Sequence, residues 1–318
     1  MAAPVIVADI GGTYSRFALV GPDGIEPDPA SIIALENERY GSLGDALADY
    51  GRRTGAKPGR GVFAVAGPID GHHVKLTNRD WVFDTDEFAR DHGLARLDVV
   101  NDFVALARAL PYLHDDELTP LGAPPRRDGA KVALGPGTGL GVAGLLHVDG
   151  RWIAVPSEAG HVECAAIGPR ETALFDVLRK RFGRVQAETV ISGPGLSNLD
   201  HAIRTLDGQT GVDRDAPAIV AAATAGEARA EEAVALLLGL LARFAGDMAL
   251  AFLAHGGVYL AGGVLAHLAG FVEAARFRTV FADKAPFDGL LAGIAVNLVR
   301  LDGQPALRGC AAIAGDHA

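Results

Sequence analysis

Short apolar runs alternate with turns rich in glycine or aspartate along the whole chain. The run at residues 5–10 predicts a short buried strand, and residues 17–20 resume a strand after a two-glycine turn. The same pattern predicts strands at 31–35, 61–66, 97–100, 131–134, 142–147 and 258–260, and helices at 42–53, from 84 onward, 103–110, 171–182 and 227–254. Because strands and helices alternate, we expect an α/β fold.

A strand, a glycine-rich turn and a second strand occur near the N-terminus and again at residues 131–147. This coarse duplication predicts two α/β halves that face each other. The segment 111–130 between them is rich in proline, glycine and charge, and is the best candidate for a crossover between domains.

Composition narrows the class of protein. The chain has 318 residues, of which 49% are hydrophobic, enough for a large core and two domains. A net charge of -10 argues against nucleic acid as a partner. The two cysteines, Cys164 and Cys310, supply neither a disulfide framework nor a metal quartet.

The same sequence argues against a membrane or secreted protein. Its N-terminus lacks a basic region, and Asp9 interrupts the first apolar run, so a signal peptide is not expected. The most apolar long segment, 233–253, contains Arg243 and Asp247, which favour a buried helix over a membrane span. We therefore expect a soluble cytoplasmic protein.

The first glycine turn carries candidate chemistry. Gly11 and Gly12 let backbone N–H groups approach a phosphate, and the Thr13 hydroxyl adds a donor. Asp9 can hold a magnesium ion, directly or through water. A plain hairpin turn with a solubilising aspartate explains this motif equally well when it is taken alone.

The second glycine-rich loop spans residues 135–141. Within it, residues 139–144 match the dinucleotide pattern G-x-G-x-x-G, but that pattern requires a following helix, and a strand is predicted here. The Gly-Lys-Ser/Thr of a Walker loop is also missing. We predict a second phosphate turn, with Thr138 and Gly139 facing the phosphates. Two such turns can bind the phosphates of one nucleotide from both sides. The alternative interpretation, a flexible hairpin, is weaker.

Several polar groups stand at predicted element ends. Asn101 and Asp102 lie between a strand and a helix, where an aspartate is either a helix cap or a base that takes a proton from a substrate hydroxyl. Glu158 and His161 offer an acceptor and a donor suited to a polyhydroxy substrate. A metal site made of His161, Glu163 and Cys164 lacks the usual ligand count and spacing.

Two further features are ambiguous by themselves. Glu188 taken alone is best explained as a surface charge on a helix. Gly262 and Gly263 follow a strand and precede a helix, where glycines permit either close approach of a flat ring or phosphate, or ordinary helix–strand packing.

Taken together, seven segments resemble the bacterial glucokinase family of the hexokinase/actin-like ATPase superfamily. They occur in the family's order and cover nearly the whole chain: 9–13, 76–81, 100–103, 134–142, 158–161, 191–196 and 260–264. The resemblance implies a two-domain actin-like ATPase (ribonuclease H-like) fold with an interdomain cleft. It places residues 1–111 and 300–318 in a small domain and 112–299 in a large one. It further implies ATP with magnesium, phosphorylation of D-glucose at its 6-hydroxyl, and a homodimer.

The resemblance also assigns roles to residues. It makes Asp102 the general base and Asp9 the magnesium residue. The groups it assigns to the sugar hydroxyls are Asn101, Asp102, Glu158, His161 and Glu188. The groups it assigns to the nucleotide are Asp9, Gly11, Gly12, Thr13, Thr138 and Gly139 at the phosphates, and Gly262 and Gly263 near the adenosine.

Three positions depart from the family pattern. Tyr14 stands where a small or polar residue is usual, which is expected to alter nucleotide affinity or crowd the cleft. Ala159 replaces a usual glycine between the two sugar-binding residues, and Arg308 lies in a usually apolar segment. None of the three removes a catalytic group.

Rival functions remain open at the level of sequence. A kinase of another hexose, such as mannose, fructose or an amino sugar, is the main one. A sugar-sensing regulator on the same fold is a second, although no DNA-binding module or basic surface is visible. A phosphatase or polyphosphate hydrolase of the superfamily is disfavoured by the sugar-binding set. The related branch with a cysteine-rich zinc knot is excluded by the low cysteine count.

Overall fold

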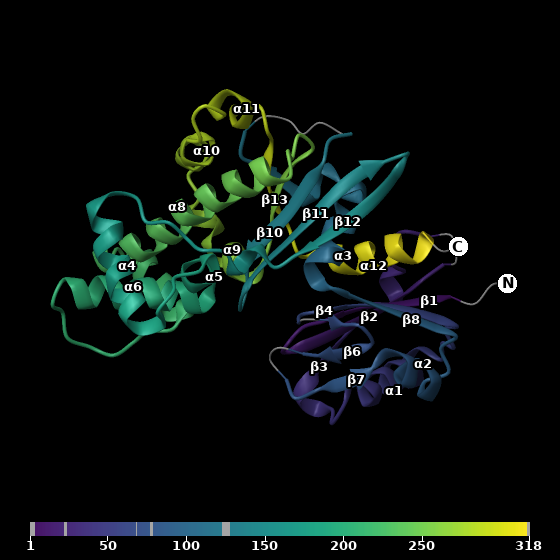
Figure 1. Cartoon of the computed structure of the whole chain (residues 1–318). Coiled ribbons are helices and arrows are strands. Elements are labelled where there is room, and N and C mark those ends of the chain that lie inside the picture. Colours follow the sequence, from purple (N-terminus) through teal and green to yellow (C-terminus); the bar gives the residue numbers. More distant parts are fainter. Residues whose placement is uncertain (1–3, 22–23, 68, 77–78, 123–127, 317–318) are drawn as a thin grey trace. The chain divides into compact units, whose positions relative to one another are not determined.

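Two compact units make up the chain (Figure 1). The computed structural model describes residues 4–21, 24–67, 69–76, 79–122 and 128–316. The first unit holds Met1–His114, Trp152–Pro156 and Asp302–Ala318, and the second holds Asp115–Arg151 and Ser157–Leu301. Each unit combines a mixed sheet with helices, as the alternating pattern predicts for an α/β fold.

The first unit is built on a five-stranded sheet in the order β3-β2-β1-β4-β8. Its strands are β1 (Val5–Ile10), β2 (Tyr14–Val20), β3 (Ile33–Glu36), β4 (Arg60–Val65) and β8 (Arg96–Asn101). β1 pairs antiparallel with β2 and parallel with β4, and β8 runs parallel to β4. The parallel strands therefore end at the same edge of the sheet, where ligands bind in α/β folds.

Helices cover both faces of this sheet, as the alternation of side chains along β1 requires. Ile6 and Ile10 join one apolar cluster with Tyr50 of α1 (Leu43–Thr54). Val7 joins the other cluster with Leu307 of α12 (Pro305–Gly315). Both faces of β1 are thus buried, which explains its nearly continuous apolar run.

The helix α12 lies beside α3 (Asp102–Ala109) in Figure 1. A β-carbon on Gly309 would stand 1.7 Å from the Ala105 carbonyl oxygen, so this packing requires glycine there. Arg308, which the sequence left unexplained, is buried and lies 2.9 Å from a Glu26 carboxylate oxygen. The charge in an otherwise apolar helix is therefore paired.

A small antiparallel sheet completes the first unit. Its strands are β5 (Ile69–Asp70), β6 (His73–Lys75) and β7 (Val82–Asp84), and α2 (Thr85–Asp91) follows. Asp84 caps α2 by accepting hydrogen bonds from the amides of Asp86 and Glu87 at 2.9 and 3.1 Å. The acidic start predicted for a helix near residue 84 is confirmed.

In the second unit, strands follow one another in the order β11-β10-β13-β14-β9. They are β9 (Leu118–Pro120), β10 (Lys131–Pro136), β11 (Leu140–Val148), β13 (Gly257–Leu260) and β14 (Val296–Val299). β10 forms an antiparallel hairpin with β11 and a parallel pair with β13. This repeats the arrangement of β1 with β2 and β4, so the predicted duplication is present. The strand β12 (Arg151–Ser157) follows β11 along the chain, and its residues 152–156 group with the first unit.

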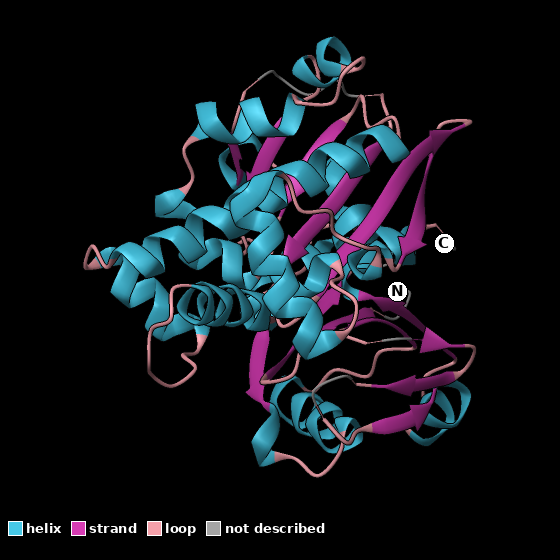
Figure 2. Ribbon diagram, turned by 60° about the vertical axis from the view of Figure 1, so that its left-hand side comes forward, coloured by secondary structure: helices cyan, strands magenta, loops and turns pink. Residues whose placement is uncertain are grey.

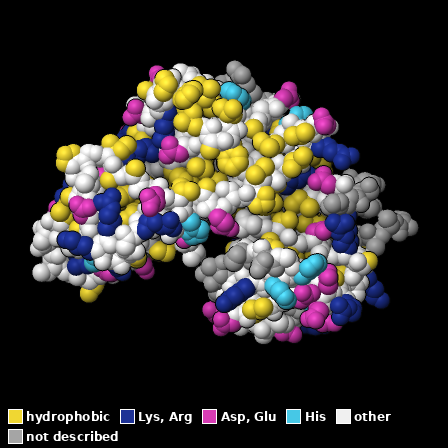
Figure 3. Space-filling view, in the orientation of Figure 1, with side chains coloured by type: hydrophobic (Ala, Val, Ile, Leu, Met, Phe, Trp, Pro, Cys, Tyr) yellow, Lys and Arg dark blue, Asp and Glu magenta, His cyan; other side chains and the backbone are white. Residues whose placement is uncertain are grey.

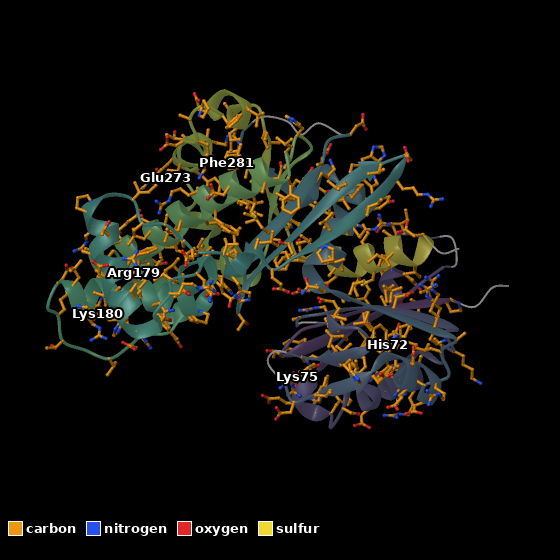
Figure 4. The ribbon with its side chains drawn as sticks, viewed as in Figure 1. His72, Lys75, Arg179, Lys180, Glu273 and Phe281 are labelled. Carbon is orange, nitrogen blue, oxygen red and sulfur yellow. The ribbon has the colours of Figure 1, made fainter. Side chains whose placement is uncertain are left out.

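Figure 2 shows helices in cyan against the magenta strands. Those of the second unit are α4 (Gly168–Phe182), α5 (Ala187–Val190), α6 (Gly193–Leu206), α7 (Ala216–Thr224), α8 (Ala228–Ala251), α9 (Gly263–Leu268), α10 (Ala274–Ala282) and α11 (Asp288–Ala292). Their apolar sides form one large core, which includes the buried Phe281 of α10 (Figure 4).

The long helix α8 is apolar and long enough to cross a membrane by length and composition. However, 67% of its most apolar window is buried inside the second unit. The two charges in its C-terminal half are paired: Arg243 lies 2.7 Å from Glu171, and Asp247 lies 2.5 Å from Lys284. These observations support the predicted core helix.

Basic residues gather at the C-terminal end of α4, where the helix dipole favours positive charge. Arg179 and Lys180 belong to this group (Figure 4), and Arg179 pairs with Asp176. On the face shown in Figure 3, the described Lys and Arg side chains are interspersed with acidic and apolar ones. This face therefore does not present one large basic patch.

Candidate functional site

The first glycine turn joins β1 to β2 and is anchored through its carbonyl oxygens. Asn37, fully buried, donates from Nδ2 to the Gly11 oxygen at 2.8 Å, and Arg79 donates to the Gly12 oxygen at 3.1 Å. The amides of Gly12 and Thr13 donate no hydrogen bond within the described part of the chain. They remain available for an anion, as a phosphate-binding turn requires.

Asn37 and Arg79 were not predicted from the sequence. Arg79 lies in segment 76–81, one of the segments that carry the family resemblance. Its presence in that segment could have indicated a role in the site. Residues 77 and 78 of that segment lie outside the described residues.

Asp9 stands on β1 directly opposite Arg16 of β2, and its Oδ2 lies 3.5 Å from the guanidinium. Burial raises the pKa of Asp9, and the positive charge of Arg16 partly offsets this effect. A bound cation would therefore stabilise the ionised carboxylate of Asp9.

Asp102 lies where β8 ends and α3 begins, at the sheet edge shared by the parallel strands. The helix cap is Asn101, whose side-chain oxygen accepts from the Phe103 amide at 2.9 Å. Burial first, and the nearby charge of Asp9 second, raise the pKa of Asp102 to about 7. Asp102 Oδ1 accepts from the same amide at 3.0 Å, so both side chains contribute to the cap, and Asp102 in addition has the proton affinity of a base working near neutral pH.

A buried arginine on the same helix fixes its position. Arg108 is 3% exposed and donates to the Trp152 carbonyl, to the Ala312 carbonyl at 3.1 Å and to Asp316 at 2.6 Å. It thereby ties α3 to two distant segments of the first unit. Periodicity alone places Arg108 on a helix but does not reveal these partners.

The second glycine-rich loop connects β10 to β11 in the second unit. A strand follows the glycines, so rejection of the dinucleotide pattern was correct. The loop is tightened by a hydrogen bond from the Gly137 amide to the Gly139 oxygen at 2.8 Å. The amide at the start of α6, Gly193, donates to the Gly137 oxygen at 2.9 Å. Thr138 is exposed at the tip.

The predicted sugar-binding residues of the second unit lie in one neighbourhood. His161 ends a single 3-10 turn that begins at Ala159, and its Nε2 lies 3.9 Å from a Glu158 oxygen. Its Nδ1 is 2.8 Å from the Gln186 side-chain oxygen. Glu188, two residues further on, accepts a hydrogen bond from the Leu140 amide at 2.9 Å.

One of these contacts revises an expectation. Glu188 is more than a surface charge, because its carboxylate binds the glycine-rich loop. Within the described residues, no group of three or more His, Cys, Asp and Glu side chains is arranged to hold a metal. Gln186 was not predicted, and only its closeness in sequence to Glu188 pointed to it.

The glycines after β13 have different environments. Gly262 has a φ of 111°, and a β-carbon there would stand 2.3 Å from the Pro136 carbonyl oxygen. Close packing of β10 against the end of β13 therefore requires this glycine, whatever it binds. Gly263 begins α9 with open space around it. The assignment of both to the adenosine stays a prediction.

The departures at Tyr14 and Ala159 are accommodated locally. Tyr14 is 38% exposed and its ring lies 5.9 Å from the Arg16 guanidinium carbon. Ala159 packs against the hydrophobic core of the second unit. The position without room is Gly160, where a β-carbon would stand 2.1 Å from the Leu140 oxygen.

Known proteins resemble this chain in both sequence and structure. A family model described as Glucokinase matches residues 6–317. A glucokinase from Chromobacterium violaceum is 41% identical over 320 residues, covering 99% of this chain and 90% of the relative. The crystal structure of a glucokinase from an Antarctic psychrotroph has a TM-score of 0.87 and 33% identity, covering 99% of this chain and 100% of that one.

A more distant structure extends the comparison of the fold. A ROK family glucokinase from Streptomyces griseus, in complex with glucose and AMPPNP, has a TM-score of 0.63 and 18% identity, covering 98% of this chain and 99% of that one. The two α/β units with their glycine turns therefore have the actin-like ATPase fold of sugar kinases. Within that class, the chain belongs to the glucokinase family.

Proposed function

We propose that the chain transfers the γ-phosphoryl group of ATP to the 6-hydroxyl of D-glucose, giving glucose 6-phosphate and ADP. The observation that carries this proposal is Asp102, a carboxylate at a ligand-binding sheet edge whose pKa is raised to about 7. Membership of the glucokinase family supports glucose as the substrate and ATP as the donor.

Asp102 acts as the general base. Its carboxylate takes the proton of the 6-hydroxyl while that oxygen forms a bond to the γ-phosphorus. The bond between the γ-phosphorus and the β–γ bridging oxygen breaks, and ADP leaves. A positioned base contributes about 10²–10⁴-fold to such a step. Asn101, Glu158, His161 and Glu188 bind and orient the sugar hydroxyls.

The two glycine-rich turns position the nucleotide. The free amides of Gly12 and Thr13 and the hydroxyls of Thr13 and Thr138 donate to phosphate oxygens. Asp9 fits a magnesium ion, because a carboxylate oxygen is a preferred magnesium ligand and the carboxylate of Asp102 lies near enough for the two negative charges to interact. Bound magnesium would neutralise phosphate charge during transfer.

Assay of ADP release with D-glucose, mannose, fructose, glucosamine and no sugar tests this function. We expect turnover with glucose, and low ATP hydrolysis without sugar because the geometry for phosphoryl transfer is completed only when sugar binds. Preferred turnover of another hexose would favour the rival kinase, whereas sugar binding without ADP release would favour a sensor.

The family resemblance also leads us to propose a cytoplasmic homodimer. Light scattering of the purified protein distinguishes a monomer from a dimer of two 32.9 kDa chains.

A further inference from the structure

The carboxylate of Glu188 makes a contact that sugar binding does not explain. Its Oε2 accepts a hydrogen bond from the Leu140 amide at 2.9 Å, at the end of the glycine-rich loop. Its other oxygen, Oε1, accepts no hydrogen bond within the described residues. One oxygen is therefore engaged by the loop, and the other is open to a ligand.

Hydrogen bonds hold the backbone that carries Glu188 in place. The Ser192 hydroxyl donates to the Glu188 carbonyl at 2.8 Å, and the Gln186 amide donates to the Thr189 hydroxyl at 3.1 Å. These bonds fix the single-turn helix α5 that carries Glu188. The carboxylate thus approaches the loop from a rigid support.

The loop sequence is adapted to this carboxylate. A β-carbon on Gly139 would stand 2.5 Å from Glu188 Oε2, whereas one on Gly137 would meet nothing within 4 Å. The φ of Gly139 does not lie in the left-handed region, so its backbone does not demand glycine. A β-carbon at 139 would therefore force the Glu188 carboxylate to move away from the position in which it binds the loop.

We propose that Glu188 is a positioning residue for the phosphate-binding loop as well as a sugar ligand. This inference rests on the proposed function. Oε2 holds the Leu140 amide and so sets the geometry of residues 137–140, while Oε1 accepts from a sugar hydroxyl. A single carboxylate then links the sugar subsite to the phosphate loop. Because a sugar hydroxyl on Oε1 restrains the side chain, sugar and nucleotide each favour binding of the other.

A matched pair of variants separates the two roles. Glu188→Gln and Glu188→Ala both remove the negative charge, but only glutamine keeps an oxygen that can accept from the Leu140 amide. Binding of AMPPNP with magnesium is measured by calorimetry without sugar, and amide hydrogen exchange is measured for residues 137–141. We expect Glu188→Ala to bind AMPPNP about tenfold more weakly than Glu188→Gln, the effect of one lost hydrogen bond. We also expect its loop amides to exchange faster.

Glu158 supplies the control, since it belongs to the predicted sugar set but has no described hydrogen bond to the loop. Glu158→Gln and Glu158→Ala are expected to bind AMPPNP alike. Equal nucleotide affinity and equal loop exchange in the two Glu188 variants would overturn the inference. Failure of the wild-type protein to phosphorylate glucose would contradict the proposed function instead, and the exchange comparison would still decide the role of Glu188 in the loop.

Discussion

Replacing Asp102, the proposed general base, is expected to stabilise the protein. In the folded state, the pKa of Asp102 rises from 3.8 to about 7. The folded protein therefore keeps a proton that the unfolded chain has already released between these two pH values. Since the native state then binds more protons than the unfolded state, the free energy of unfolding falls as pH rises through this window.

The magnitude follows from the size of the shift. At 1.36 kcal/mol for each pKa unit, roughly three units set an upper limit of about 4 kcal/mol above pH 7. Because Asp102 retains some contact with water, we expect about half of that, near 2 kcal/mol. In Asp102→Asn, the side-chain oxygen can still accept from the Phe103 amide, so the contribution of this bond to folding is retained.

Urea unfolding of the wild type and Asp102→Asn across pH 4 to 8 tests this reasoning. The variant should gain no advantage near pH 4, gain steadily up to pH 7 and hold a constant advantage above it. Asp91→Asn, an exposed substitution on α2, serves as the control and should show no such trend. An advantage that does not change with pH, or a less stable variant at pH 8, would refute the assignment of a raised pKa to Asp102.

Three further predictions concern the pKa of Asp102, the contact between His161 and Gln186, and the packing of α12 at Gly309. The kcat/KM for glucose should rise with pH, with a midpoint near 7 set by Asp102. Asp9→Asn should shift this midpoint to lower pH, because the charge of Asp9 raises the pKa of Asp102. An unshifted midpoint would contradict this. Gln186→Leu should raise the KM for glucose about tenfold with little change in kcat, because His161, a proposed sugar ligand, loses its hydrogen-bond partner; unchanged sugar kinetics would count against that positioning role. Gly309→Ala should lower the free energy of unfolding by about 3 kcal/mol through a clash with a carbonyl of α3, whereas Gly315→Ala, where the added β-carbon meets nothing within 4 Å, should change it little in the same unfolding measurement.

The apolar pattern was sufficient to predict the central elements of the fold. Strands such as β1 and β10 are buried on both faces, so their apolar runs are continuous and easily found. The small sheet of β5, β6 and β7 was missed because its strands have two or three residues each, too short for any period to emerge. The helix α12 was also missed, because its many small residues and Arg308 obscure an apolar stripe.

The candidate site was predicted where chemistry and local sequence coincide. Glycine turns and the Asn101-Asp102 pair have local signatures, and family resemblance added roles that no spacing alone assigns. Long-range partners escaped prediction: Arg108 and Asn37 act through carbonyl oxygens far away in sequence. Such contacts depend on tertiary packing, which a single sequence does not specify.

One measurement tests directly whether Asp102 is the general base of an ATP-dependent glucose phosphorylation. ADP release and glucose 6-phosphate formation are followed with magnesium and ATP for the wild type and Asp102→Asn, with glucose binding measured in parallel. We expect glucose-dependent turnover in the wild type and a loss of about 10²–10⁴-fold in the variant, with glucose binding largely retained. Turnover by Asp102→Asn within a few-fold of the wild type would contradict it.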